Sequence, residues 1–180
     1  DGSNEVAAAT LNVKYPLTDD MESGTDNWDA GPPWGLTDED AHSGTHCLTD
    51  SPGSNYGNNL DISLRTSIDL SDAVMPYLSF WHRYELENYN DFGYVEVSTD
   101  NGVTWERLYF ATGTQVDWTE VKIDLTCYAH LPQVMIRFRL TSNATLTYDG
   151  WHIDDVKVED STKIIPYPFF DDMEAQSDNW

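Results

Sequence analysis

Two stretches of fourteen residues in this sequence are closely similar, and their spacing constrains the domain organisation of the chain. Residues 15–28 read YPLTDDMESGTDNW and residues 167–180 read YPFFDDMEAQSDNW, with nine identical positions at an offset of 152. A period of this length is the size of a domain and far exceeds that of a solenoid repeat. We therefore expect a tandem array: one complete module over residues 14–160, a linker at 1–13, and at 161–180 a second linker with the first strand of a following repeat.

The module is predicted to consist of short β-strands. Runs rich in β-branched and aromatic residues recur between turn signals, and several alternate, as where Val95 and Val97 point opposite to Tyr94 and Glu96. No amphipathic helix pattern is found, so we expect no helix longer than two or three turns. Short strands at this spacing predict an all-β fold, an antiparallel β-sandwich of the jelly-roll type. The runs are 60–68, 77–86, 93–98, 104–110, 119–125, 133–141 and 151–158.

The charge of the chain is strongly negative. Nine Lys and Arg stand against 32 Asp and Glu, which gives a formal net charge of −23. Such a surface repels phosphates and anionic lipids, so we expect no nucleic-acid and no membrane partner. Aromatic residues at 13%, with seven Trp, argue that the chain folds in spite of its self-repulsion. Divalent cations would relieve that repulsion; the alternative is a surface that is simply very soluble.

Two motifs resemble pieces of catalytic machinery, but neither indicates catalysis. Residues 98–105, STDNGVTW, have the form of an Asp-box, in which Asp100 accepts bonds from the turn and Gly102 supplies a positive φ. The motif occurs once, so we read it as a device that fixes one hairpin. In the run 81–84, WHRY, alternation places His82 and Tyr84 on one face of the strand and Trp81 and Arg83 on the other. We therefore expect these residues to have a structural role between strands. No catalytic residue is assigned.

The acidic residues are more informative. They gather at 19–22, at 38–40 and at 154–155, and calcium takes six to eight oxygen ligands, usually from several segments. The first and last strands of an antiparallel sandwich are often neighbours, so these carboxylates could meet. Asp154 is in phase with Val156 and Val158, which predicts that it faces the apolar side and needs a partner. A metal would be one such partner; hydrogen bonds to a turn, or a pairing with Arg137 or Arg139, would be another.

The succession DDMESG, AHSGTHCL, the Asp-box hairpin, MIRFRL and GWHIDDVKV resembles MAM-type or jelly-roll modules of secreted bacterial proteins, familiar beside metallopeptidases of the immune inhibitor A kind. In layout it is also similar to calcium-stabilised carbohydrate-binding jelly rolls. The resemblance covers about residues 15–160. It implies one structural Ca²⁺ where the first strand, the HSG-like turn and the last strand meet. The implied ligands are the side chains of Glu22, Asp40 and Asp154 and the backbone carbonyls of Asp20 and Ser43.

Two functions from different classes remain after this comparison. The first is a non-catalytic accessory or adhesion module of a secreted or cell-surface protein, monomeric and joined to neighbouring domains of the same chain. The second is a carbohydrate-binding module whose partner is a polysaccharide or cell-surface glycan. Its candidate stacking residues are Trp28, Trp34, Tyr56, Trp81, Tyr84 and Tyr89. Cys47 and Cys127 are either a disulfide in an oxidising compartment or two small buried apolar residues.

Overall fold

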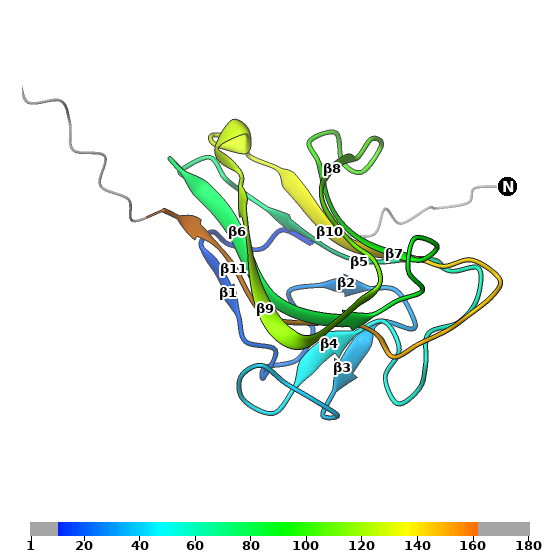
Figure 1. The fold of residues 1–180 in the computed structure, drawn as a ribbon. Coiled ribbons are helices and arrows are strands. Elements are labelled where there is room, and N and C mark those ends of the chain that lie inside the picture. Colours follow the sequence, from blue (N-terminus) through cyan, green and yellow to red (C-terminus); the bar gives the residue numbers. More distant parts are fainter. Residues whose placement is uncertain (1–10, 162–180) are drawn as a thin grey trace, which may run out of the picture.

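The computed structural model describes residues 11–161, which fold into two antiparallel β-sheets packed face to face (Figure 1). The predicted fold class is confirmed. One sheet has the strand order β3-β4-β11-β6-β9, with β1 also paired to β11, and the other has the order β2-β5-β10-β7-β8. The first comprises β1 (Leu17–Asp19), β3 (Gly35–Thr37), β4 (Cys47–Thr49), β6 (Pro76–Glu85), β9 (Thr114–Asp124) and β11 (Gly150–Asp160); the second comprises β2 (Asp29–Ala30), β5 (Asp61–Ile68), β7 (Phe92–Ser98), β8 (Glu106–Ala111) and β10 (Val134–Thr141).

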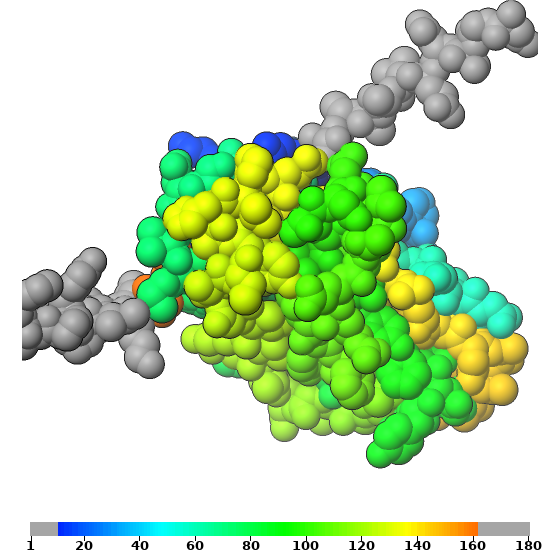
Figure 2. Space-filling model, turned by 90° about the horizontal axis from the view of Figure 1, so that it is seen from above, coloured from blue at the N-terminus to red at the C-terminus, as the bar shows by residue number. Residues whose placement is uncertain are grey.

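Each of the seven predicted strands is present, as β5 to β11. The four strands β1 to β4 are two or three residues long, too short for an alternating pattern to identify them. A short 3-10 helix, η1 (Thr126–Tyr128), follows β9. The segment after β9 (yellow) lies against the hairpin formed by β7 and β8 (green) at one end of the sandwich (Figure 2), where the Tyr128 hydroxyl donates to Glu106 over 3.0 Å.

The core lies between the sheets and is built by alternation along the long strands. In β10, Val134, Ile136, Phe138 and Leu140 are buried, while the residues between them face outward. Aromatic rings join the two layers, since Phe138 lies 5.1 Å from the Phe80 ring and 5.6 Å from the Trp151 ring. Edge-on contacts of this kind add to the stability gained by burying the rings.

The Asp-box fixes the β7–β8 hairpin, as the sequence predicted. Asp100 accepts hydrogen bonds from the Thr104 backbone and from the Ser98 hydroxyl at 2.7–3.1 Å. Gly102 has a φ of 82°, and its carbonyl accepts from the Trp105 indole at 3.0 Å. These contacts close the turn locally.

The predicted structural role of His82 is also confirmed. His82 is buried beside Phe80, and the Trp151 indole N–H donates to its Nδ1 over 3.1 Å. Burial lowers the pKa of His82 to about 4, so the ring is neutral and can accept this bond at neutral pH. Trp81 and Arg83 point to the opposite, outer face of the sheet, where each contacts a residue of the 40–46 loop.

Asp154 is buried as predicted, but it does not face the interior. It pairs across the sheet with Trp81 on the outer face, and a β-bulge between Asp154 and Lys157 shifts the register. The bulge contains Asp155, whose φ is 48°. Because the bulge adds a residue, the alternation that aligned Asp154 with Val156 does not hold across it. The loop at 40–46 covers Asp154 from outside.

The remaining predictions about the chain are partly tested. Cys47 is buried, Cys127 is exposed, and both are free thiols, so they do not form the disulfide. Val13, at the end of the predicted first linker, bridges to Ile68 and donates its N–H to Ser67. The repeat at 167–180 lies outside the described residues. Among residues 11–161 there is no helix long and apolar enough to span a membrane.

Candidate functional site

The aromatic residues that the sequence proposed for sugar stacking do not form one platform. Trp28, Trp34 and Tyr56 belong to the core. The Tyr56 hydroxyl donates over 2.6 Å to the buried Asp91. Rings buried in this way have no face free for a ligand.

The other three candidates lie apart from one another. Trp81 is half-buried and stacks on the His42 ring at 3.7 Å, so one of its faces is already occupied. Tyr84 is half-buried on the inner side, beside His82. Tyr89 is 79% exposed at the turn between β6 and β7, in a left-handed conformation with a φ of 61°. Of the proposed residues, Tyr89 alone presents an open ring, and a single ring gives little affinity.

The predicted calcium ligands are partly brought together, around the turn at 42–46. The Glu22 carboxylate accepts from the backbone N–H groups of Thr45 and His46 at 2.8 and 2.7 Å. Gly44 allows this approach, because its φ is +64° and a Cβ on it would lie 2.6 Å from the Glu22 carboxyl carbon. These hydrogen bonds lower the pKa of Glu22 to about 2. Glu22 therefore holds the turn from the side of the first strand.

Asp154 holds the same turn from the last strand. Its Oδ2 accepts from the N–H groups of His42 and Ser43 at 2.8 and 3.1 Å. Burial raises the pKa of Asp154. The neighbouring Asp155 lies 2.6 Å from His42 Nδ1 and accepts from the Ser43 hydroxyl at 3.0 Å. Hydrogen bonding to a turn, one of the alternatives from the sequence, is thus how Asp154 is satisfied; Arg137 and Arg139 belong to the other sheet.

Asp40, the third predicted carboxylate ligand, has a different partner. Asp40 lies 2.7 Å from Nε of Arg83. The Nη1 atom of the same arginine lies 3.1 Å from Asp149. Asp20 is exposed and accepts from the Glu22 N–H. In the part of the chain that the structure describes, no three acidic, His or Cys side chains are grouped to hold a metal. Of the three predicted carboxylate ligands, only Glu22 and Asp154 contact this turn, and an ion there would need backbone carbonyls as well.

A second candidate surface was not found from the sequence. It is the outer face of the β2-β5-β10-β7-β8 sheet, which we call the arginine face. Strand pairing aligns Arg65, Arg137, Glu96 and Arg107 in one row across four strands. The next row contains Arg139, Tyr94 and Phe110. The face is defined by Arg65, Phe92, Tyr94, Glu96, Trp105, Arg107, Phe110, Arg137 and Arg139.

Ion pairs and ring contacts order this face. Arg137 Nε lies 2.6 Å from Glu96, and its guanidinium stacks 4.0 Å over the Trp105 ring. Arg139 makes a two-pronged contact with Asp61 at 2.6 and 2.8 Å. Such planar contacts hold the guanidinium groups in fixed positions. The alternation of arginine in MIRFRL was the available sequence signal, but the row across four strands exists only in the folded sheet.

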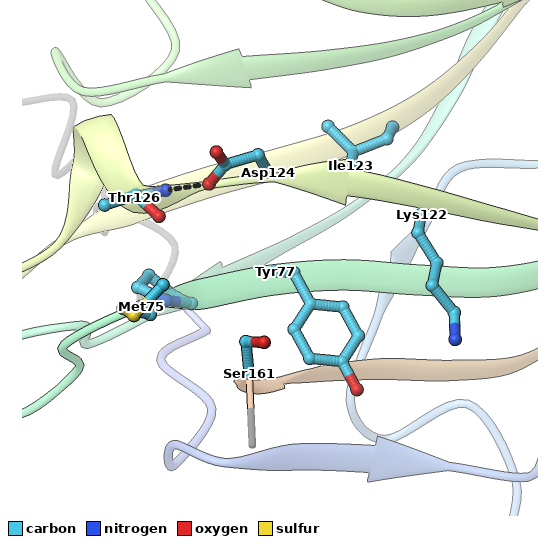
Figure 3. Close-up of a pocket in the computed structure, with 8 residues that line it drawn as sticks. Met75, Tyr77, Lys122, Ile123, Asp124, Thr126 and Ser161 are labelled. Atoms are coloured by element: carbon cyan, nitrogen blue, oxygen red, sulfur yellow. Dashed lines mark hydrogen bonds between the residues drawn. The ribbon is translucent and has the colours of Figure 1, made fainter. Parts of the chain in front are cut away.

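A shallow hollow of about 350 Å³ lies elsewhere, beside the strands β6 and β9 (Figure 3). Met75, Tyr77 and Ile123 contribute its apolar lining, and Asp124 accepts from the Thr126 N–H beside it. Ser161, the last described residue, also lines it. None of the predicted calcium or sugar ligands contributes to this hollow.

The fold defines the class of protein to which this chain is similar, the jelly-roll module. The C-terminal family 22 carbohydrate-binding module of Clostridium thermocellum Xyn10B matches with a TM-score of 0.56 at 13% identity, over 83% of this chain and 96% of that one. TmCBM61, solved with β-1,4-galactotriose, gives 0.54 at 17% identity over 78% and 94%. The K3 adhesin domain of Lys-gingipain from Porphyromonas gingivalis gives 0.53 at 20% identity over 81% and 98%.

The sequence itself gives the family. The chain belongs to the Reelin subrepeat B family, which it matches over residues 66–159. It is also 31% identical over 144 residues to Bacillopeptidase F of Bacillus subtilis (strain 168). That match covers 79% of this chain but 10% of the relative, so the chain corresponds to a small part of that protein's length. The MAM-type resemblance stays a prediction.

Proposed function

We propose that this chain is a non-catalytic accessory or adhesion module of a larger extracellular protein. One observation carries the proposal: a region of module size in Bacillopeptidase F, 10% of its length, is 31% identical to most of this chain. The resemblance to an adhesin domain and to carbohydrate-binding modules supports the same role.

A polysaccharide partner is the second candidate function, favoured by the exposed aromatic and arginine side chains of the arginine face. Retention of the protein on insoluble xylan, galactan and cellulose and on immobilised polygalacturonate, together with an assay for released reducing sugar on the same materials, tests both statements. We expect retention on at least one polysaccharide with no release of sugar. Sugar release that disappears on a single substitution would contradict a non-catalytic role, and retention on none would contradict the glycan partner.

Calcium is a further part of the proposal. Glu22 and Asp154 hold the 42–46 turn from the first and last strands, and carboxylates with backbone carbonyls are the oxygen ligands that Ca²⁺ prefers. Asp20 and Ser43 would contribute carbonyls, as the resemblance implies. Asp40 is left out because Arg83 is its partner. An ion here would tie the two ends of the module together, so its role would be structural.

The melting temperature in calcium and in EDTA tests this part. A ligand present at a hundredfold excess over its Kd stabilises a fold by about 2.7 kcal/mol, which corresponds to roughly 5–11 °C for a domain of this size. Glu22→Gln and Asp154→Asn should each abolish most of the calcium-dependent difference, whereas Asp72→Asn, at an exposed position, should leave it unchanged. Equal melting temperatures in calcium and EDTA, with no metal found by elemental analysis, would refute the site.

A further inference from the structure

The arginines of this chain are not spread over its surface. The sequence has five, in a molecule of net charge −23, and four of them, all except Arg83, lie on the arginine face. Three carboxylates pair with them there: Asp29, Asp61 and Glu96. This face therefore has no excess of negative charge, in contrast to the rest of the surface. It is the region where an anionic ligand meets the least repulsion.

Arg107 differs from the other three arginines of the face. Arg65, Arg137 and Arg139 each have a carboxylate partner, whereas within residues 11–161 no ion pair is formed by Arg107. Glu96 lies opposite it in the strand register but is engaged by Arg137 at 2.6 Å and Arg139 at 3.7 Å. Arg107 is exposed, so its guanidinium donors point to a surface from which a ligand can approach.

Aromatic rings surround this guanidinium. Arg107 lies 5.6 Å from the centroids of both Tyr94 and Phe110. Phe92 stacks on Tyr94 at 5.6 Å with an interplanar angle of 14°, and its centroid is 6.4 Å from that of Phe110. Phe110 is 53% exposed, so its ring is open to a ligand. Three rings and one guanidinium without a carboxylate partner thus form a compact patch on β7 and β8.

We propose that this patch binds a polysaccharide that carries carboxylates, such as a chain of uronic acids. A sugar ring would lie on Phe110 and Tyr94, and its carboxylate would accept from Arg107, whose planar fork matches that group. The inference rests on the proposed function, of which it names the ligand class and the site. Binding of a carboxylate by Arg107 would not need the aromatic rings. The rings favour a glycan over an acidic protein segment, because a sugar ring stacks on them.

Affinity electrophoresis and titration calorimetry with polygalacturonate test the proposal. We expect the intact protein to bind polygalacturonate, and its fully methyl-esterified form at least tenfold more weakly. Arg107→Gln and Phe110→Ala should each lower the affinity at least tenfold, because one removes the carboxylate partner and the other the ring. Lys122→Gln, which deletes the same charge from the opposite sheet, should bind as the intact protein does. Binding should be the same in calcium and in EDTA, since the site needs no ion.

Four results would overturn the inference. Equal binding of the esterified polymer would mean that the carboxylates are not recognised. Equal binding of poly-L-glutamate would mean that the ring contributes nothing and that an acidic protein segment is the ligand. Binding that requires calcium and survives Arg107→Gln would indicate an ion bridging two acidic polymers. Binding of neutral xylan or galactan alone would overturn the acidic class while leaving the glycan partner intact. Circular dichroism of each variant verifies that the fold is retained.

Discussion

Acidification from pH 7 to pH 4 is expected to weaken the fold through His82. This imidazole is buried between the sheets and accepts the Trp151 indole N–H through Nδ1. Its pKa is about 4 because of burial, against an ordinary value of 6.5. Below pH 6.5 the unfolded chain therefore binds a proton that the folded chain excludes, and stability falls until the pH reaches about 4.

The size of the effect follows from the pKa shift. A fall of the pKa from 6.5 to about 4 corresponds to a loss of roughly 3 kcal/mol in the free energy of unfolding at pH 4. Against a typical stability of about 5–15 kcal/mol, this is a large fraction of the total. His82→Gln removes the titrating group but keeps an oxygen that can accept from Trp151. The variant loses ring packing with Phe80, so it should be the less stable protein at pH 7.

Urea unfolding followed by tryptophan fluorescence at pH 7, 6, 5 and 4 measures the effect. The stability advantage of the unmodified protein over His82→Gln should shrink by about 3 kcal/mol between pH 7 and pH 4. His152 and the carboxyl groups titrate in both proteins, so their contributions cancel in the difference. His130→Gln, at an exposed position, is the control for loss of an imidazole. A difference that is constant with pH would refute the reasoning, as would direct titration of His82 near pH 6.5 by NMR.

Three further outcomes are expected. Burial raises the pKa of Asp50 to about 7, so ionisation of this carboxyl lowers the stability increasingly from pH 3.8 upward. In urea unfolding, the stability of Asp50→Asn relative to the unmodified protein should therefore increase by about 2–3 kcal/mol between pH 5 and pH 8. A stability difference that is independent of pH would contradict this. Trp105→Ala removes the ring beneath Arg137 and the hydrogen bond to the Gly102 carbonyl. The variant should lose about 1–3 kcal/mol of unfolding free energy, measured by thermal unfolding. An unchanged stability would mean that the turn closes without this ring. Deletion of 162–180 should leave the melting temperature nearly unchanged, and a fall of many degrees would show that the tail belongs to this fold.

Part of the candidate site was open to prediction because it depends on residue type and on adjacency in the sequence. The Asp-box hairpin is one case, since Asp100, Gly102 and Trp105 contact one another within a few residues. The contacts of Glu22 and Asp154 with the 42–46 turn join distant segments, and only the resemblance indicated that these segments meet. Asp40, in the loop after β3, pairs with Arg83 of β6, a contact between distant segments that no local pattern indicates. Trp28, Trp34 and Tyr56 lie in the core and not on a binding surface, because sequence does not tell a buried ring from an exposed one.

The sequence by itself determined the long strands, their turns and hence the sandwich, because the two-residue period that separates core from solvent is written locally in each strand. Tertiary structure alone decided three other things. The short strands β1 to β4 exist only through hydrogen bonds to distant partners. The bulge after Asp154 put Val156 and Val158 out of phase with it, so that Asp154 lies on the outer face while both valines lie in the core. The arginine face required β5, β10, β7 and β8 to lie side by side, and a surface assembled from four separate segments has no signature in any one of them.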